Sequence, residues 1–137
     1  MPMNYWLIKS EPYKYSWDQM VADGETYWDG VRNYAARLNL RGMNTGDHCL
    51  FYHSNEGKEI VGIVEVVKEA YQDPTTDDDR WDAVDVKAIR PLKRPVTLQE
   101  IKADETLDQM DLVRQTRLSV GKVRKHEYDR IIAMSES

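Results

Sequence analysis

Apolar residues occur in short runs along this chain, a pattern typical of short strands that alternate with short helices. Residues 48–53 are apolar at odd and even positions alike and predict a strand covered on both faces. Residues 60–67 are rich in β-branched side chains, and Gly62 among them indicates a bulge or a close backbone approach. Residues 82–89 alternate as in a half-buried strand, and further extended segments are predicted at residues 4–9, 27–30 and 117–120.

Helix signals separate these strands. The pattern predicts helices at residues 17–23, 33–41, 97–103 and 125–134, with one helical turn at residues 106–110. Ser16 and Gln19 have the spacing of a capping box, and Gly24 supplies the stop of that helix. Thr97 and Glu100 repeat the capping-box spacing at the start of a later helix.

Two connecting segments are predicted to lack regular structure. Pro91 and Pro95 bracket a turn, and residues 71–79 form an acidic loop. The acidic run at residues 77–79 lacks the glycine and final glutamate of a calcium loop and is interpreted as solvated.

The length of 137 residues fits one domain, residues 1–137, since single cores commonly occupy about 100–150 residues. The chain contains no internal repeat and no linker-like stretch. Short strands mixed with short helices predict an α+β fold, a small closed sheet decorated by helices.

The sequence also carries signals about location. It contains no apolar stretch approaching the roughly 18–20 residues that span a bilayer, and its amino terminus lacks the basic and apolar regions of a secretion signal. The single cysteine, Cys49, cannot form an internal disulfide. We therefore expect a cytoplasmic protein in a reducing compartment, without membrane partners.

Charge is spread unevenly. The net charge of −5 argues against a uniformly basic face that grips nucleic acid. Residues 69–85 contain seven acidic side chains and one arginine, whereas residues 31–42 contain Arg32, Arg37 and Arg41 without an acid. Residues 112–130 contain six basic and two acidic side chains. The two basic strips are candidates for phosphate contacts, with solvated faces as the alternative.

Eight of the 13 aromatic residues lie between Tyr5 and Tyr34. A pocket with flat aromatic faces and a few polar edges is suited to a planar heterocycle, although large aromatic residues also dominate ordinary cores.

Catalytic signals are weaker. Cys49 and His53 share one face of their strand and could act as nucleophile and base, but their separation is long for a direct hydrogen bond. A small buried hydrophobe is the more common role of cysteine. Three scattered histidines with one cysteine give no metal-ligand spacing, and no phosphate-cradling glycine loop is present. Neither a metal nor a cofactor is expected.

Several motifs resemble the EVE domain across nearly the whole chain. They are YWLIKSEP at residues 5–12, WDGVRNY at 28–34, FYHSN at 51–55, GIVEVV at 62–67 and RLSV at 117–120. The resemblance implies a PUA-like pseudo-barrel of about six mostly antiparallel strands decorated by short helices. It also implies non-catalytic binding of a modified nucleobase, such as 5-methylcytosine, in DNA or RNA.

The resemblance further implies which side chains face the ligand. The pocket-side candidates are Trp6, Lys9, Ser10, Glu11, Trp28, Asp29, Asn33, Tyr34, Tyr52, His53, Ser54 and Asn55. The expected contacts to the nucleic-acid backbone are Arg32, Arg37, Arg41, Arg114, Arg117 and Lys122. Asp29 is the preferred discriminator, because a carboxylate can accept from the exocyclic amine of cytosine. Ala35 and Leu38 depart from residues common in the family, which leaves the modification that is read open.

Competing functions remain open at this point. The same fold could serve as an RNA-binding module in RNA processing, which matched RNA and DNA oligonucleotides would separate. The chain could instead be a small-molecule enzyme built on Cys49 and His53, or a scaffold whose aromatic patch binds protein. A monomer is expected.

Overall fold

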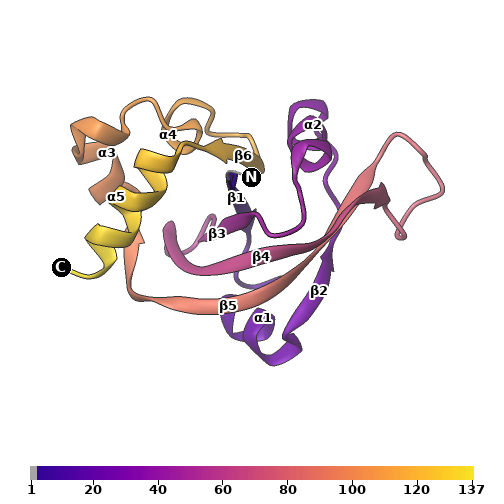
Figure 1. The fold of residues 1–137 in the computed structure, drawn as a ribbon, viewed down its shortest axis with the longest axis horizontal. Helices are drawn as coiled ribbons and strands as arrows, with labels where there is room; N and C mark the ends of the chain where they lie inside the picture. The colour runs from indigo at the N-terminus through magenta and orange to yellow at the C-terminus, as the bar shows by residue number, and fades with distance from the viewer. Residues whose placement is uncertain (1–2) are drawn as a thin grey trace.

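The computed structural model describes residues 3–137, and strands and helices alternate along the chain much as predicted (Figure 1). In chain order the elements are β1 (Tyr5–Ser10), α1 (Trp17–Asp23), β2 (Glu25–Trp28), α2 (Tyr34–Gly42), β3 (His48–His53), β4 (Glu59–Gln72), β5 (Asp82–Thr97), α3 (Leu98–Ala103), the 3-10 turn η1 (Glu105–Leu107), α4 (Asp111–Arg114), β6 (Val120–Val123) and α5 (Lys125–Ser135). Within the described residues, no helix combines the length and hydropathy that crossing a bilayer requires.

The strands form one mixed sheet in the order β2-β5-β4-β3-β1-β6. β1 and β3 are parallel, and the other neighbouring pairs are antiparallel. The predicted α+β class with six mostly antiparallel strands is therefore confirmed. The expected closure of the sheet is wrong, because β2 and β6 form its two edges and no strand pairing joins them within residues 3–137.

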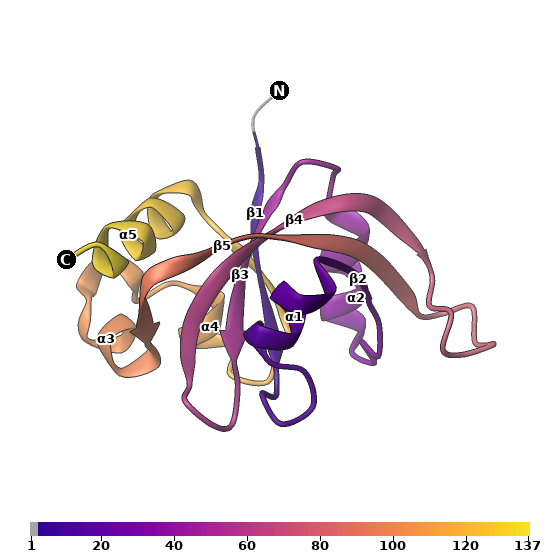
Figure 2. The same cartoon turned by 90° about the horizontal axis from the view of Figure 1, so that it is seen from below.

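Both faces of the sheet are covered. Alternation along β3 sends Cys49 and Phe51 to one buried cluster and Leu50 and Tyr52 to the other. Side chains from α1 and α2 complete the first cluster, and side chains from α3, η1, α4 and α5 complete the second. Figures 1 and 2 show α3, α4 and α5 together toward one end of the molecule, while α1 and α2 lie nearer the β4–β5 hairpin that forms the other end. The prediction that residues 48–53 are buried on both faces is confirmed.

Gly62 marks a close approach, as predicted. A Cβ atom at this position would lie 2.5 Å from the indole of Trp17, which real Cβ contacts do not tolerate. The pairing of β4 with β5 also shifts register between Ile60 and Gly62. The missing side chain thus makes room for an α1 side chain that packs on the sheet.

Gly62→Ala should lower the free energy of unfolding by about 1–3 kcal/mol, because the added methyl group overpacks the core against Trp17. Urea denaturation measures this loss. In a Trp17→Leu background, where the smaller side chain leaves space, the same change should cost clearly less. An equal cost in both backgrounds would rule out the steric explanation.

Three local predictions need correction. The predicted turn at Pro91 and Pro95 is part of β5, which is possible because β2 accompanies β5 only as far as Lys87. Beyond that residue β5 lies at an edge, where the missing N–H group of proline interrupts no pairing on the outer side. The extended segment predicted at residues 117–120 begins as a turn, and β6 starts only at Val120.

The third correction concerns the start of α1. Gln19 does not complete the first capping box, because its side chain bonds to Asp23 at 2.9 Å while Ser16 alone caps α1. The short helix α4, Asp111–Arg114, was not predicted. The second capping box, Thr97 with Glu100, is confirmed.

Candidate functional site

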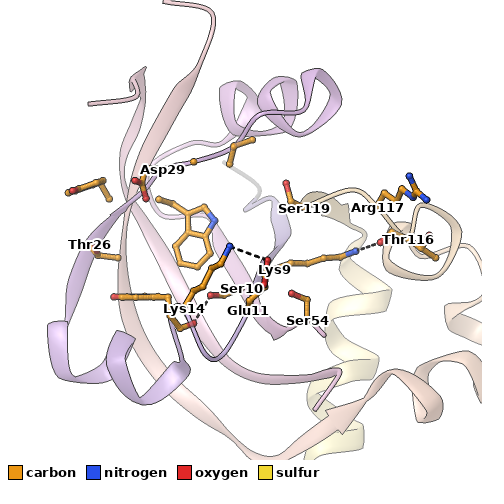
Figure 3. Close-up of a pocket in the computed structure, with 15 residues that line it drawn as sticks. Lys9, Ser10, Glu11, Lys14, Thr26, Asp29, Ser54, Thr116, Arg117 and Ser119 are labelled. Carbon is orange, nitrogen blue, oxygen red and sulfur yellow. Dashed lines mark hydrogen bonds and ion pairs between the residues drawn. The ribbon is translucent and has the colours of Figure 1, made fainter. Parts of the chain in front are cut away.

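A cavity of about 650 Å³ opens where the ends of β1 and β2 face the loop before β6 (Figure 3). Its volume lies within the usual range of ligand pockets, about 300–1,000 Å³. One wall contains Lys9, Ser10 and Glu11 from the end of β1. The opposite wall comes from β2 and the turn that follows it, and the last wall from residues 116–119.

Backbone hydrogen bonds hold these segments together. The amide of Lys9 donates to the carbonyl of Ser119 at 3.0 Å, and the amide of Ser54 donates to the carbonyl of Ser10 at 2.8 Å. The loops after β3 and before β6 are thereby fixed on either side of β1. Three segments that are distant in sequence therefore form one rigid rim.

Aromatic rings from β2 and the loop before α1 form the apolar part of the cavity. Trp28 is only 9% exposed and packs edge-to-face against Phe51 and Tyr15, with ring centroids 5.5 and 6.0 Å away. Burial and a hydrogen bond to Asp23 raise the pKa of Tyr15 to about 12, so its hydroxyl stays protonated. Tyr27, also in the lining, is 48% exposed. The Trp28 ring is thus held in place by its neighbours and presents only a small part of its surface to the cavity.

Among the carboxylates of the cavity, Asp29 keeps free acceptor oxygens. It is exposed, and within residues 3–137 it forms neither an ion pair nor a hydrogen bond. Glu11, by contrast, accepts a hydrogen bond from Tyr13, which lowers the pKa of Glu11, and lies 3.8 Å from Lys14. Asp29 is therefore the carboxylate available to a donor on a ligand.

A buried carboxylate holds the turn that carries Asp29. Asp73 is fully buried, and its Oδ2 accepts from the amide of Gly30 and from the guanidinium of Arg32, each at 2.9 Å. Its Oδ1 accepts from the amide and hydroxyl of Thr75. Burial alone would raise the pKa of this carboxyl, but hydrogen bonds from Thr75, Gly30 and Arg32 lower it to about 2. Gly30 itself has a φ of 75°, which favours glycine.

The structure brings many of the predicted site residues to this cavity. Those that line it are Lys9, Ser10, Glu11, Trp28, Asp29, Ser54 and Arg117. Sequence reasoning missed the other lining residues, which are Lys14, Tyr15, Thr26, Tyr27, Gly30, Val31, Thr116 and Ser119. For Tyr15 and Tyr27 the clustering of aromatic residues was the available signal.

Several other predicted residues lie elsewhere. Trp6 is buried in the core, where its Nε1 donates to Asp47 at 2.9 Å. Tyr52 belongs to the cluster on the opposite face of the sheet, and the Nε2 atom of His53 accepts from the amide of Trp17 at 3.0 Å. Asn55, with a φ of 66°, lines a neighbouring hollow.

The two predicted residues at the start of α2 have roles of their own. Asn33 caps the helix, accepting from the amide of Ala36 at 3.0 Å. Tyr34 is 52% exposed and packs against Trp81, with ring centroids 5.2 Å apart. Neither lines the cavity.

The arginines near α2 bind the acidic segment between β4 and β5. Arg32 pairs with Asp73, Arg41 pairs with Asp82, and Arg37 donates to the carbonyl of Arg80 at 2.7 Å. Figures 1 and 2 show this segment projecting at the end of the long β4–β5 hairpin. The arginine strip thus anchors the loop to the domain. Of the other basic candidates, Arg114 and Lys122 do not line the cavity.

The Cys49–His53 dyad is not formed. The two residues lie four positions apart along β3, about 13 Å at roughly 3.3 Å per residue. Cys49 is fully buried, and burial together with the charge of Asp47 raises the pKa of its thiol. A protonated, inaccessible thiol is a poor nucleophile. Within residues 3–137, no group of three potential metal ligands comes together either.

Comparison with known proteins agrees with this fold. The family model for the EVE domain matches residues 4–134. Mouse thymocyte nuclear protein 1 is 37% identical over 98% of this chain and 74% of its own length. The crystal structure of Atu2648 from Agrobacterium tumefaciens is 47% identical with a TM-score of 0.95, covering 96% of this chain and 92% of that one. The human THYN1 protein, crystallised in complex with DNA containing 5-methylcytosine, is 34% identical with a TM-score of 0.91, covering 98% of each chain. This chain belongs to the EVE domain family.

Proposed function

We propose that this protein binds a modified cytosine base of the 5-methylcytosine kind, presented by DNA or RNA, and that it does so without catalysis. The observation that carries the proposal is the cavity, which combines aromatic rings with the Asp29 carboxylate, a group that has no ion-pair partner among residues 3–137. The complex of the human relative with DNA containing 5-methylcytosine supports the same ligand class. The burial of Cys49 supports a binding role over an enzyme built on that thiol.

The geometry of the cavity suits a single base that is unstacked from its neighbours in the strand. Extrusion of a base from a duplex costs a few kcal/mol, and contacts with aromatic rings contribute roughly 1–3 kcal/mol per base. Tyr15, Tyr27 and Trp28 supply rings on one side of the cavity. Asp29 then accepts from the exocyclic amine, which cytosine has and thymine lacks.

Selectivity for the methyl group is expected to be modest. One methyl group in an apolar slot is worth about 1–3 kcal/mol, or roughly 10- to 200-fold in affinity. Calorimetric titration with 5-methyl-2′-deoxycytidine, 2′-deoxycytidine and thymidine measures it. We expect the methylated cytidine to bind tightest and thymidine weakest.

The same titration can contradict the proposal. Equal affinity for all three nucleosides, or tightest binding of thymidine, would exclude recognition of the cytosine edge. Matched DNA and RNA oligonucleotides that carry one 5-methylcytosine then identify the strand type, because only RNA offers a 2′-hydroxyl group.

A further inference from the structure

Two smaller hollows continue from the cavity. The first, about 280 Å³, shares Lys9, Ser54 and Thr116 with the cavity. The second, about 470 Å³, shares Lys58, Leu98 and Lys102 with the first. Because each hollow shares lining residues with the next, the three lie next to one another on the surface, in a row that leads away from the cavity. We name the two smaller hollows the lysine groove.

The lysine groove is positively charged in an acidic protein. The chain has 24 acidic and 19 basic residues, yet the lining contains Lys9, Lys58 and Lys102 and no aspartate or glutamate. Glu56 and Glu59, the carboxylates nearest to Lys58 in sequence, line neither hollow. Within residues 3–137, none of the three lysines forms an ion pair. Their charges are therefore available to an anion.

Lys9 lies at the junction of the cavity and the groove. Its Nζ donates to the carbonyl of Thr116 at 3.0 Å, and Figure 3 shows the side chain extending from β1 toward that residue. An ammonium group has three donors, so further donors remain for a ligand. Partial burial without a carboxylate partner lowers the pKa of Lys9. A bound anion would compensate this desolvation.

Lys58 and Lys102 belong to two segments that a backbone hydrogen bond connects. The carbonyl of Lys58 accepts from the amide of Leu98 at 2.8 Å, which fixes the turn after β3 to the start of α3. Lys102 lies one turn further along α3. Both side chains are exposed while their backbones are held. The groove is thus built on a connected framework.

We propose that the lysine groove binds phosphodiester groups of the nucleic-acid strand that flank the seated base. The strand then leaves the cavity over Lys9 toward Lys58 and Lys102. This path differs from the one expected along α2, where Arg32 and Arg41 pair with carboxylates and Arg37 bonds to a backbone carbonyl. The inference rests on the proposed function, because the seated base defines where the strand starts.

A charge-removing variant tests this path. Lys58→Gln/Lys102→Gln keeps a polar, unbranched side chain at each position and removes two charges. Lys87→Gln/Lys125→Gln is the matched control, since these lysines pair on the surface with Glu65 and Asp129. Fluorescence anisotropy measures the affinity of a labelled single-stranded DNA with one 5-methylcytosine over a range of salt concentrations. Each lost phosphate contact lowers the slope of log affinity against log salt by about 0.7 on single strands, so the first variant should lose about 1.4. That corresponds to roughly 25-fold weaker binding near 0.1 M salt.

The nucleoside separates this inference from the proposed function. Affinity for 5-methyl-2′-deoxycytidine, which has no phosphate, should be unchanged in the groove variant. If the nucleoside binds but the groove variant shows the slope of the control, the strand path is overturned while base binding stands. If the nucleoside fails to bind the wild type but the slope change persists, base binding is overturned and the phosphate contacts stand.

Inorganic phosphate distinguishes a strand from a free anion. At constant ionic strength it should compete only weakly with the oligonucleotide, because it engages the lysines without the neighbouring base. Competition by inorganic phosphate as effective as that by unlabelled oligonucleotide would assign the groove to a free anion and overturn the strand path.

Discussion

Replacing Asp29 with alanine should weaken the binding of 5-methyl-2′-deoxycytidine by about 10- to 150-fold. A hydrogen bond to a charged group contributes about 1.5–3 kcal/mol, and each 1.4 kcal/mol is tenfold in affinity. Asp29 is exposed and forms no ion pair within the described part of the chain, so its removal breaks no internal contact of that kind. The free energy of unfolding should therefore change by no more than about 0.5 kcal/mol.

Calorimetric titration of the nucleoside and urea denaturation of each variant separate these two effects. Glu25→Ala is the matched control, because Glu25 is an exposed carboxylate on β2 that lies outside the cavity lining. Asp29→Asn should show a smaller loss than Asp29→Ala, since a neutral amide oxygen still accepts a hydrogen bond. Equal losses for Asp29→Ala and Glu25→Ala would show that Asp29 does not contact the base.

Replacing Asp73 with alanine should lower the free energy of unfolding by about 1.5–3 kcal/mol, the usual contribution of hydrogen bonds to a charged group, because the Asp73 carboxylate is buried while the Arg32 side chain stays 40% exposed. The change leaves the guanidinium of Arg32 and the amides of Gly30 and Thr75 without their acceptor. Urea denaturation measures the loss. Asp77→Ala, an exposed change on the same loop, should stay within about 0.5 kcal/mol. Similar losses for both variants would contradict the anchoring role of Asp73.

The stabilisation by Asp73 should also depend on pH. Its pKa in the folded protein is lowered from 3.8 to about 2, so the charged form is favoured by folding. The corresponding stability is fully present above pH 3.8 and is lost as the pH falls toward 2. The difference in unfolding free energy between the wild type and Asp73→Asn should shrink over this interval. A constant difference would mean that the charge of Asp73 is not what stabilises the turn.

The sequence pattern predicted strands that have the same neighbours along their whole length. The central residues of β3 are apolar on both faces of the strand, and that pattern alone indicates a strand covered on both sides. Gly62 stood out because glycine weakens a strand unless another group needs its space. The proline-containing half of β5 could not be predicted in this way. Its tolerance for Pro91 depends on where β2 ends, which is a property of the sheet and not of the segment.

The lining of the cavity was predicted where contacts are local and missed where they are distant. Asp29 follows directly on β2, so its place beside Trp28 was readable from the motif. Trp6 and Trp28 are both indoles in strands, and only the distant partner Asp47 distinguishes the core residue from the cavity residue.

The roles of the arginines near α2 were also missed because their partners are distant in sequence. Arg32, Arg37 and Arg41 have no acidic neighbour in sequence, and the acidic segment that they bind lies about forty residues later. The two opposite charge biases were visible separately in the sequence. The opposite charges of the two segments were the signal from which their contact could have been predicted.

The position of β1 in the sheet determines when its two neighbouring strands can pair with it during synthesis on a ribosome. β1 lies between β3 and β6, so Ile8 pairs with both Phe51 and Val120. During synthesis one side of β1 therefore stays unpaired until residues 120–123 have been made. Residues 116–119, which form one wall of the cavity, are made only shortly before β6, so a nascent chain cannot complete the cavity from its first hundred residues.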